Sequence, residues 1–415
     1  MVFVPVGVGD PLPETVVAVV LMLALTAYAV LGGADFGGGV WDLLARGPRA
    51  EAQRQAIARA MGPVWEANHV WLIFALVLLF TAFPRAYSSL GVALFVPFHL
   101  VLAGIVLRGA AFVFRAPAAT AAGPQRAWAS VFGAASTITP FLLGATLAAV
   151  SSGGIRVDAD GTVTVDAVYA WFSPFSLLVG ALTVALFAYL AAVYLTVETR
   201  GALQEDFRRR ALGAGLAVAV LAAVLLPLAP RTAPHLWELL SERGRPLVAA
   251  GAALAALSAW LVWRRRFLLA RVAAVAEVVV LLWGWALGQW PYLIYPDVTV
   301  FNAAAPDPIL RFALWVTPVG LLILIPSLWL LFAVFKGDNP QADEPVGSPG
   351  RQADEAAPHP RPLADPPVAR PALRRDAAAA SPAPHADEPA VDPARQGEPQ
   401  AERTPGGAPG GRTGR

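Results

Sequence analysis

Long apolar stretches separated by short polar segments run along most of this chain. Nine of them reach about the 20 residues that a helix needs to cross a bilayer. They cover residues 14–33, 64–83, 88–112, 126–150, 172–197, 211–230, 246–263, 267–290 and 311–335, the seventh being the weakest because it is short and rich in alanine. The ten-residue alternation of a membrane barrel is absent, and isolated strands cannot satisfy their backbone groups in lipid. The pattern predicts an all-α, multi-pass membrane protein.

Composition agrees with this and divides the chain in two. Only 14% of the 415 residues are charged, against about 25% in an average soluble protein. Residues 341–415 contain 15 prolines, 9 arginines, 11 acidic residues and no aromatic residue, which is typical of a disordered tail. We therefore expect a transmembrane helical domain over 1–340 and a disordered cytoplasmic tail over 341–415. The net charge of +2 gives no argument for nucleic-acid binding, and the absence of cysteine excludes disulfides and thiolate metal sites.

The arginines predict how the domain is oriented. Fifteen lie at the connections after the first, third, fifth and seventh stretches, and six lie at the other connections. By the positive-inside rule the first set is cytoplasmic, which places the N-terminus outside and the tail inside a bacterial cytoplasmic membrane. The first stretch has no basic region before it, so we expect a retained span rather than a secretory signal. On the outer side, Asp160-Gly161 lies between alternating β-branched residues, which predicts a small hairpin or an ordered loop over 156–166.

Charged and polar residues at membrane depth are costly and are therefore functional candidates. Asp35 lies in a run of glycines over 32–39, which permits close helix contact or a broken helix; the alternative is an exposed Asp at a helix end. Glu66 and His69 share a helix face within the segment 62–72, a pairing that suits proton transfer or a metal. The alternative is a wetted interfacial belt. Trp65, Asn68 and Trp71 accompany this pair.

Four further residues have less decisive patterns. His99 could ligate haem, relay protons or bond a backbone group freed by Pro97, and we favour the last, or a buried contact. Arg108 could extend to the interface or pair with an acid such as Glu66 or Asp35. Glu198 fits an interfacial charge, whereas Glu277 needs a partner that the sequence does not identify.

These segments resemble, in order, subunit II of cytochrome bd-type quinol oxidases, including cyanide-insensitive relatives. The most specific piece is Gly62-Pro-Val-Trp-Glu-Ala-Asn-His-Val-Trp-Leu72. The others are Gly33-Ala-Asp-Phe-Gly-Gly-Gly39, Arg108-Gly-Ala-Ala-Phe-Val-Phe-Arg115, Ser173-Pro-Phe175, and Pro291 to Pro296 with Asn302. Each is weak alone, but five in sequence over 1–340 are strong.

The resemblance implies a complex that oxidises quinol and reduces dioxygen to water without pumping protons. It implies that b haems, haem d and the quinol site lie mainly in a haem-bearing subunit I, so that this chain has no catalytic residue of its own, no metal site and unknown cofactor contacts. A small single-span subunit and a structural quinone are further candidate partners. Glu66 matches the acid associated with proton entry, and Asp35 and His69 are the other proton-pathway candidates, supported by Trp65, Asn68, Trp71 and Arg108.

The chain departs from the family pattern at Gly32 and Val113, where acids are common, and at Ala67, where glycine is usual. Two other functions remain open from the sequence. A secondary transporter would also contain buried acids and glycine-broken helices, although two matching interrupted halves are not found. A purely structural scaffold would satisfy its buried acids internally.

Overall fold

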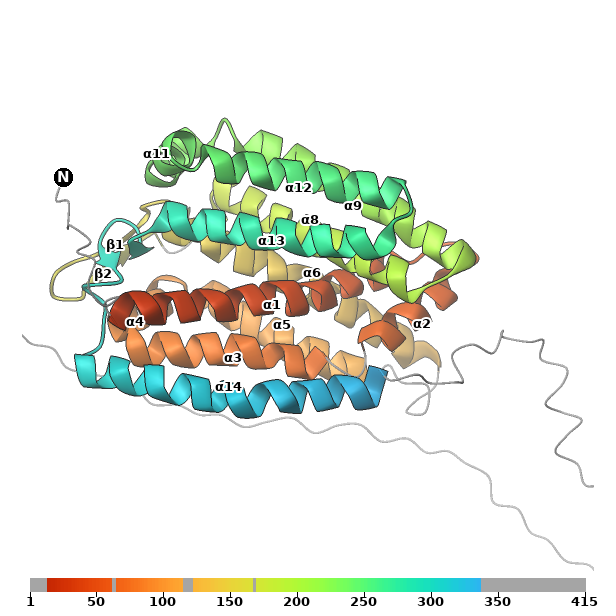
Figure 1. The fold of residues 1–415 in the computed structure, drawn as a ribbon, viewed down its shortest axis with the longest axis horizontal. Coiled ribbons are helices and arrows are strands. Elements are labelled where there is room, and N and C mark those ends of the chain that lie inside the picture. Colours follow the sequence, from red (N-terminus) through yellow and green to blue (C-terminus); the bar gives the residue numbers. More distant parts are fainter. Residues whose placement is uncertain (1–12, 62–64, 115–121, 167–168, 337–415) are drawn as a thin grey trace, which may run out of the picture. The chain divides into compact units, whose positions relative to one another are not determined.

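The computed structural model describes residues 13–61, 65–114, 122–166 and 169–336, all within one compact unit, and they fold mainly as helices (Figure 1). The long helices are α1 (Pro13–Leu43), α3 (Trp65–Ala82), α5 (Phe95–Phe114), α6 (Ala122–Ser151), α8 (Pro174–Glu198), α9 (Gly201–Leu225), α12 (Arg245–Trp263), α13 (Phe267–Gln289) and α14 (Asp307–Lys336). The short ones are α2 (Ala50–Met61), α4 (Pro84–Ala93), α7 (Tyr169–Phe172), α10 (Ala229–Thr232) and α11 (Pro234–Glu242). The tail predicted over 341–415 lies outside the described residues.

The prediction of an all-α multi-pass membrane protein is confirmed. Among the described residues, seven helices are long and apolar enough to cross a membrane: α1, α5, α6, α8, α12, α13 and α14. An eighth span is obtained if α3 and α4, which meet at 114°, are counted together. Helix α9 fails the same test; its first turns carry charged residues, among them Glu205, Asp206 and Arg208. Each of the nine predicted stretches coincides with helical structure, but nine crossings remain a prediction.

Three predicted boundaries differ from the structure. The stretch 88–112 is divided at Leu94 between α4 and α5. Pro84 opens α4, where its missing N–H costs nothing, and the chain turns sharply there after α3. Helix α1 continues to Leu43 instead of ending near 33, so the glycine run is helical and unbroken. Helix α9 begins at Gly201 rather than near 211. Its first turns contain charged residues, so they were not counted in the apolar stretch, but they are helical as well.

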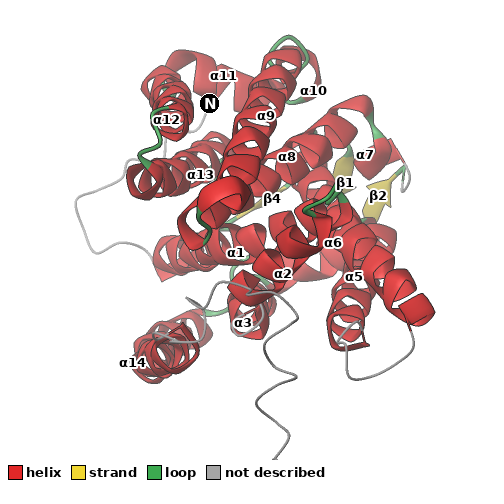
Figure 2. Ribbon diagram, turned by 90° about the vertical axis from the view of Figure 1, so that its right-hand side faces the viewer, coloured by secondary structure: helices red, strands yellow, loops and turns green. Residues whose placement is uncertain are grey.

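Helix α1 is packed among α3, α6, α8 and α13, as the end-on view of Figure 2 shows. The glycines of α1 permit this close packing. A Cβ on Gly37 would overlap the carbonyl oxygen of Phe187 in α8, and one on Gly39 would overlap the Ser136 hydroxyl in α6. The glycine run therefore allows two neighbouring helices to contact the α1 backbone directly.

Two small hairpins lie at one end of the helices, and α2 and the turn between α12 and α13 lie at the other (Figure 1). The predicted hairpin is confirmed: β1 (Ile155–Val157) pairs antiparallel with β2 (Val163–Val165). A second, unpredicted one pairs β3 (Tyr292–Ile294) with β4 (Val298–Thr299). Arg156 joins the hairpins through a bidentate ion pair with Asp297, at 2.7 and 3.1 Å.

Candidate functional site: a buried polar cluster around Asp35

Asp35 lies on the continuous helix α1 and is only 5% exposed, so it is not an exposed residue at a helix end. The Asn68 side chain, on the first turns of α3, donates a hydrogen bond from Nδ2 to Asp35 Oδ2 at 2.6 Å. Asn68 is itself buried. A carboxylate taken out of water needs such a donor, because an uncompensated buried charge is strongly destabilising.

His69 follows Asn68 in α3 and is buried beside the same part of α1. Its ring packs edge-on against Tyr28, with centroids 5.8 Å apart, and against Phe36, at 5.9 Å. Both aromatic residues belong to α1. The imidazole is thus held by aromatic contacts next to the Asp35–Asn68 pair.

Arg108 approaches the cluster from α5 and is 1% exposed, so it is buried rather than extended to the surface. Its Nε donates to Ser136 Oγ of α6 at 3.1 Å. The guanidinium carbon lies 4.9 Å from the centre of the Phe36 ring and 5.3 Å from that of Phe132. The aromatic faces stabilise the cation electrostatically, and Arg108 brings a positive charge into the cluster.

The sequence-predicted residues are therefore largely brought together: Asp35, Asn68, His69 and Arg108 come from three helices. Trp65 and Glu66 lie in the first turn of α3, but their side chains are outside what the structure describes. Trp71 packs beside Tyr28 and Phe36, and its buried indole N–H has no hydrogen-bond partner among the described residues.

Sequence reasoning missed three members of this region. Tyr28 and Ser136 are ordinary residues in apolar helices, and nothing in their immediate sequence marks them. Asp42 is 2% exposed and lies seven residues after Asp35, two helical turns along one face of α1. That spacing could have indicated it, but only if α1 had been expected to extend beyond residue 33.

Glu277 has the buried partner that the sequence could not name. It lies in α13 and accepts a hydrogen bond from Ser258 Oγ of α12 at 3.0 Å. Tyr189 of α8 donates to the same Ser258 oxygen at 2.7 Å. This second polar group links three helices.

Two other candidates have simple environments. Glu198 pairs with Arg271 at 3.5 Å at the arginine-rich end, as an interfacial charge would. His99 hydrogen-bonds through Nδ1 to the Phe95 carbonyl at 2.7 Å and packs on the Phe95 ring. The predicted partner of His99 was wrong: the bond reaches the carbonyl of Phe95 and not that of residue 93, which Pro97 leaves free, and the site is exposed.

The cluster around Asp35 combines a carboxylate and an imidazole, two side chains that can take up and release a proton, in a buried setting. No group of three or more His, Asp or Glu side chains is placed to hold a metal ion within the ranges that the structure describes.

Comparison with known proteins decides the family. The sequence profile of cytochrome bd terminal oxidase subunit II matches residues 13–335. The chain belongs to this family. The match covers every described residue except Lys336 and includes all the segments on which the resemblance was based.

Curated relatives agree with the family. The chain is 29% identical over 194 residues to cytochrome bd ubiquinol oxidase subunit 2 of Bacillus subtilis, covering 46% of this chain and 56% of that protein. It is 24% identical over 326 residues to a putative cytochrome bd menaquinol oxidase subunit II of the same organism, covering 75% and 92%. The Escherichia coli cytochrome bd-I ubiquinol oxidase subunit 2 is 28% identical over 204 residues, covering 48% and 52%. The chain therefore spans about half the length of two of these subunits II.

A solved structure shows that the fold is shared. The bd oxidase from Geobacillus thermodenitrificans superposes on this chain with a TM-score of 0.67 at 24% identity, covering 78% of this chain and 98% of the other. The helical arrangement is thus shared with a bd oxidase chain. The family predicted from the sequence motifs is confirmed by the profile match.

Proposed function

We propose that this chain is subunit II of a membrane quinol oxidase, an oxidoreductase complex that couples quinol oxidation to the reduction of dioxygen to water. The observation that carries the proposal is the family match over residues 13–335. The chain crosses the bacterial cytoplasmic membrane nine times, with its N-terminus outside. The arginine-rich connections on one side and the hairpins on the other support this orientation. The family match favours neither the transporter nor the isolated scaffold.

The haems belong to the partner, subunit I, and supply the chemistry of electron transfer and oxygen reduction there. Of the three described histidines, His69 is packed between the Tyr28 and Phe36 rings, and His235 is stacked on the Tyr295 ring. His99 bonds the Phe95 carbonyl of its own helix through Nδ1, a bond that a metal-ligating histidine also makes. We assign haem b and haem d to subunit I on the family resemblance and leave no redox step to this chain. A structural quinone and a small single-span subunit are additional components of the proposed complex.

The role of this chain is to support subunit I and to admit protons from the cytoplasm. Glu66 is the proposed entry acid, because it lies in the first turn of α3, at the predicted cytoplasmic edge. Asp35 and His69 continue the path inward, where the Asn68 amide and the Arg108 guanidinium orient the carboxylate and bring a balancing charge. Protons taken up there are used to form water, and the quinol protons leave on the outer side. The reaction then separates charge without a pump.

Co-purification tests this function. The chain is expressed together with its partner subunit, and a reduced-minus-oxidised spectrum of the purified complex is recorded. We expect b- and d-type haem bands and quinol-dependent oxygen consumption. A complex without haem absorbance would contradict the proposal, and a haem-loaded chain expressed alone would contradict the assignment of the haems to subunit I.

A further inference from the structure

Three consecutive arginines form the turn between α12 and α13. Arg264, Arg265 and Arg266 follow Trp263, and all three are exposed. Arg265 has a φ of 61°, which is uncommon for a residue with a side chain. This residue lets the chain reverse within a short turn, so the three cationic side chains are presented together at one end of two long helices.

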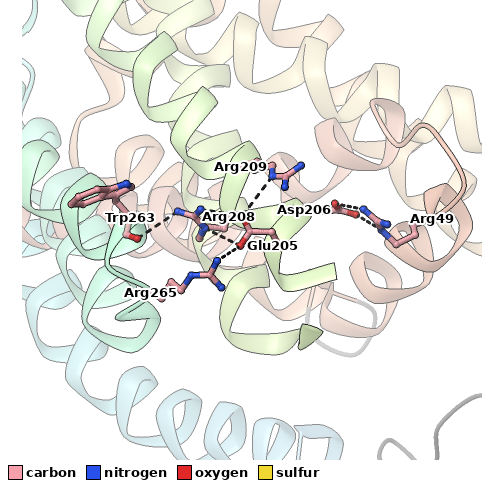
Figure 3. Close-up of polar contacts among 7 residues, drawn as sticks. All are labelled: Arg49, Glu205, Asp206, Arg208, Arg209, Trp263 and Arg265. Carbon is pink, nitrogen blue, oxygen red and sulfur yellow. Dashed lines mark hydrogen bonds and ion pairs between the residues drawn. The ribbon is translucent and has the colours of Figure 1, made fainter. Parts of the chain in front are cut away.

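The positive charge at this turn is far larger than the negative charge near it. Glu205, in the first turns of α9, pairs with Arg208 at 3.0 Å, Arg209 at 3.5 Å and Arg265 at 3.1 Å (Figure 3). Among the described residues, Arg264 and Arg266 form no ion pair. Three arginines therefore share one glutamate and two more adjoin them in the turn, an excess of four positive charges (5 − 1) that the described part of the chain does not neutralise.

Exposed aromatic and aliphatic side chains adjoin these arginines. The Arg264 guanidinium carbon lies 5.4 Å from the centre of the Trp260 ring and 5.7 Å from that of Trp263. These indoles are 48% and 61% exposed, and Leu268 and Leu269 on the next helix are exposed as well. Tryptophan beside arginine at the end of an apolar helix is typical of the headgroup level of a bilayer, where the ring contacts chains and headgroups together.

We propose that this turn binds the headgroup of an anionic phospholipid in the cytoplasmic leaflet. Arg264 and Arg266 contact the phosphate and the additional negative charge of the headgroup, while Arg265 stays paired with Glu205. Trp260, Trp263 and the exposed leucines contact the glycerol and the upper acyl chains. This inference rests on the proposed membrane orientation and not on the oxidase chemistry.

The site is tested by comparing how strongly the complex binds phosphatidylglycerol, which is anionic, and phosphatidylcholine, which is zwitterionic. The complex with its partner subunit is purified in detergent and titrated with each lipid, and bound lipid is counted by native mass spectrometry. The variant is Arg264→Gln with Arg266→Gln, which keeps the Arg265–Glu205 pair. The matched control is Arg231→Gln with Arg243→Gln, two exposed arginines near α11 at the other end of the helices.

We expect the preference for phosphatidylglycerol to fall about fivefold for each arginine removed, and to fall with added salt, while phosphatidylcholine binding and oxygen consumption stay unchanged. An unchanged preference, or an equal loss in the control, would overturn the proposal. A third arm uses the chain truncated after Asp338, because the acidic residues of the tail could also neutralise this turn. A contrary outcome is that the full-length protein binds phosphatidylglycerol no better than phosphatidylcholine while the truncated chain prefers phosphatidylglycerol. In that case the tail, and not a lipid, occupies the turn in the protein, and the proposed lipid site is wrong.

Discussion

Among the uncharged residues that the structure describes, Asn68 is the one whose loss should most disturb the polar cluster. In Asn68→Leu the side chain keeps the same number of heavy atoms and the same branching, but Asp35 loses the amide donor 2.6 Å from its carboxylate. We expect a loss of about 1–3 kcal/mol, because a buried charged acceptor is left with fewer donors. Thermal unfolding of the purified complex measures it. Thr137→Ala is the control, since its hydroxyl bonds only the Gly133 carbonyl of its own helix. Equal shifts in the two variants would contradict this role of Asn68.

Glu66→Gln separates a proton-entry role from a structural one. The amide keeps the size and hydrogen-bonding capacity of the side chain but cannot carry a proton through, so we expect slower oxygen reduction with normal assembly and haem content. The loss should amount to roughly tenfold or more, measured as quinol-dependent oxygen uptake. The control is Glu238→Gln in α11, an exposed carboxylate at the opposite end of the helices. Normal turnover in Glu66→Gln would leave this residue with a structural role.

For single residues, the sequence indicated which ionisable residues are buried better than it indicated which residues contact them. Asp35, His69 and Arg108 attracted attention because charged and ionisable residues are rare in apolar helices, and three of the helices bring them together. The partners Tyr28 and Ser136 could not be predicted, because their roles come from packing of α1 against α3 and of α5 against α6 and not from their own sequence context.

Among the helices, the contact between α1 and α8 depends on a missing side chain. In Gly37→Ala the new methyl group would overlap the Phe187 backbone carbonyl, which cannot move without displacing α8. We expect a cost of about 1–3 kcal/mol or failure to assemble. Gly213→Ala in α9 is the control, because nothing lies within 4 Å of its added Cβ. Yield of intact complex and its unfolding temperature measure the difference, and a stable Gly37→Ala complex would refute the close contact.

The two hairpins should separate in acid. The hydrogen bond from Arg156 holds the pKa of Asp297 below its usual value, and the Val157 N–H donates to the same carboxylate at 2.9 Å. A lowered pKa means that this stabilisation is fully present above the usual Asp pKa of about 4 and is lost as the pH falls through the lower, folded value. The protection of the Val157 amide, measured as its hydrogen-exchange rate relative to the intrinsic rate at the same pH, should therefore fall in that acidic range.

Asp297→Asn should remove this pH dependence of protection, because the Val157 amide should then be weakly protected at every pH. Asp160→Asn serves as the control, because the pKa of Asp160 is also lowered, but by hydrogen bonds from Thr162 within its own turn. If the Asp160 variant abolished the acid transition of Val157, the Arg156–Asp297 pair would not be its cause.

Sequence patterns predicted the elements unevenly. The length of the apolar stretches located every long helix, because a helix surface that faces lipid and one that faces protein both consist of apolar residues. The first hairpin was predictable from Asp160-Gly161, whereas Tyr292–Thr299 contains one proline, Pro296, and no such turn signal. The break between α4 and α5 at Leu94 was not recognised either, because the residues on both sides of it are apolar.

For the molecule as a whole, the absence of cysteine makes the topology directly testable. Single cysteines placed at exposed positions, Ala159→Cys in the first hairpin and Ala202→Cys at the start of α9, report the side of the membrane. With nine spans and an outer N-terminus, an impermeant thiol reagent should label residue 159 in intact cells. It should label residue 202 only after lysis, as judged by mass shift. Labelling of both residues in intact cells would contradict the proposed orientation.

Helix α1 is longer than a membrane is thick. Its 31 residues extend about 47 Å, and Asp35 lies 22 residues after Pro13, about 33 Å along the axis (35 − 13 = 22). The hydrocarbon layer is only about 30 Å thick, so the proposed orientation, with Pro13 near the outer edge of that layer, places Asp35 near the depth of the inner headgroups although protein surrounds it. Moving a charge across the membrane potential requires about 2.3 kcal/mol per 100 mV, and a proton arriving at Asp35 from the cytoplasm crosses little of that field. Loading of this carboxylate should therefore respond to cytoplasmic acidity and hardly to voltage.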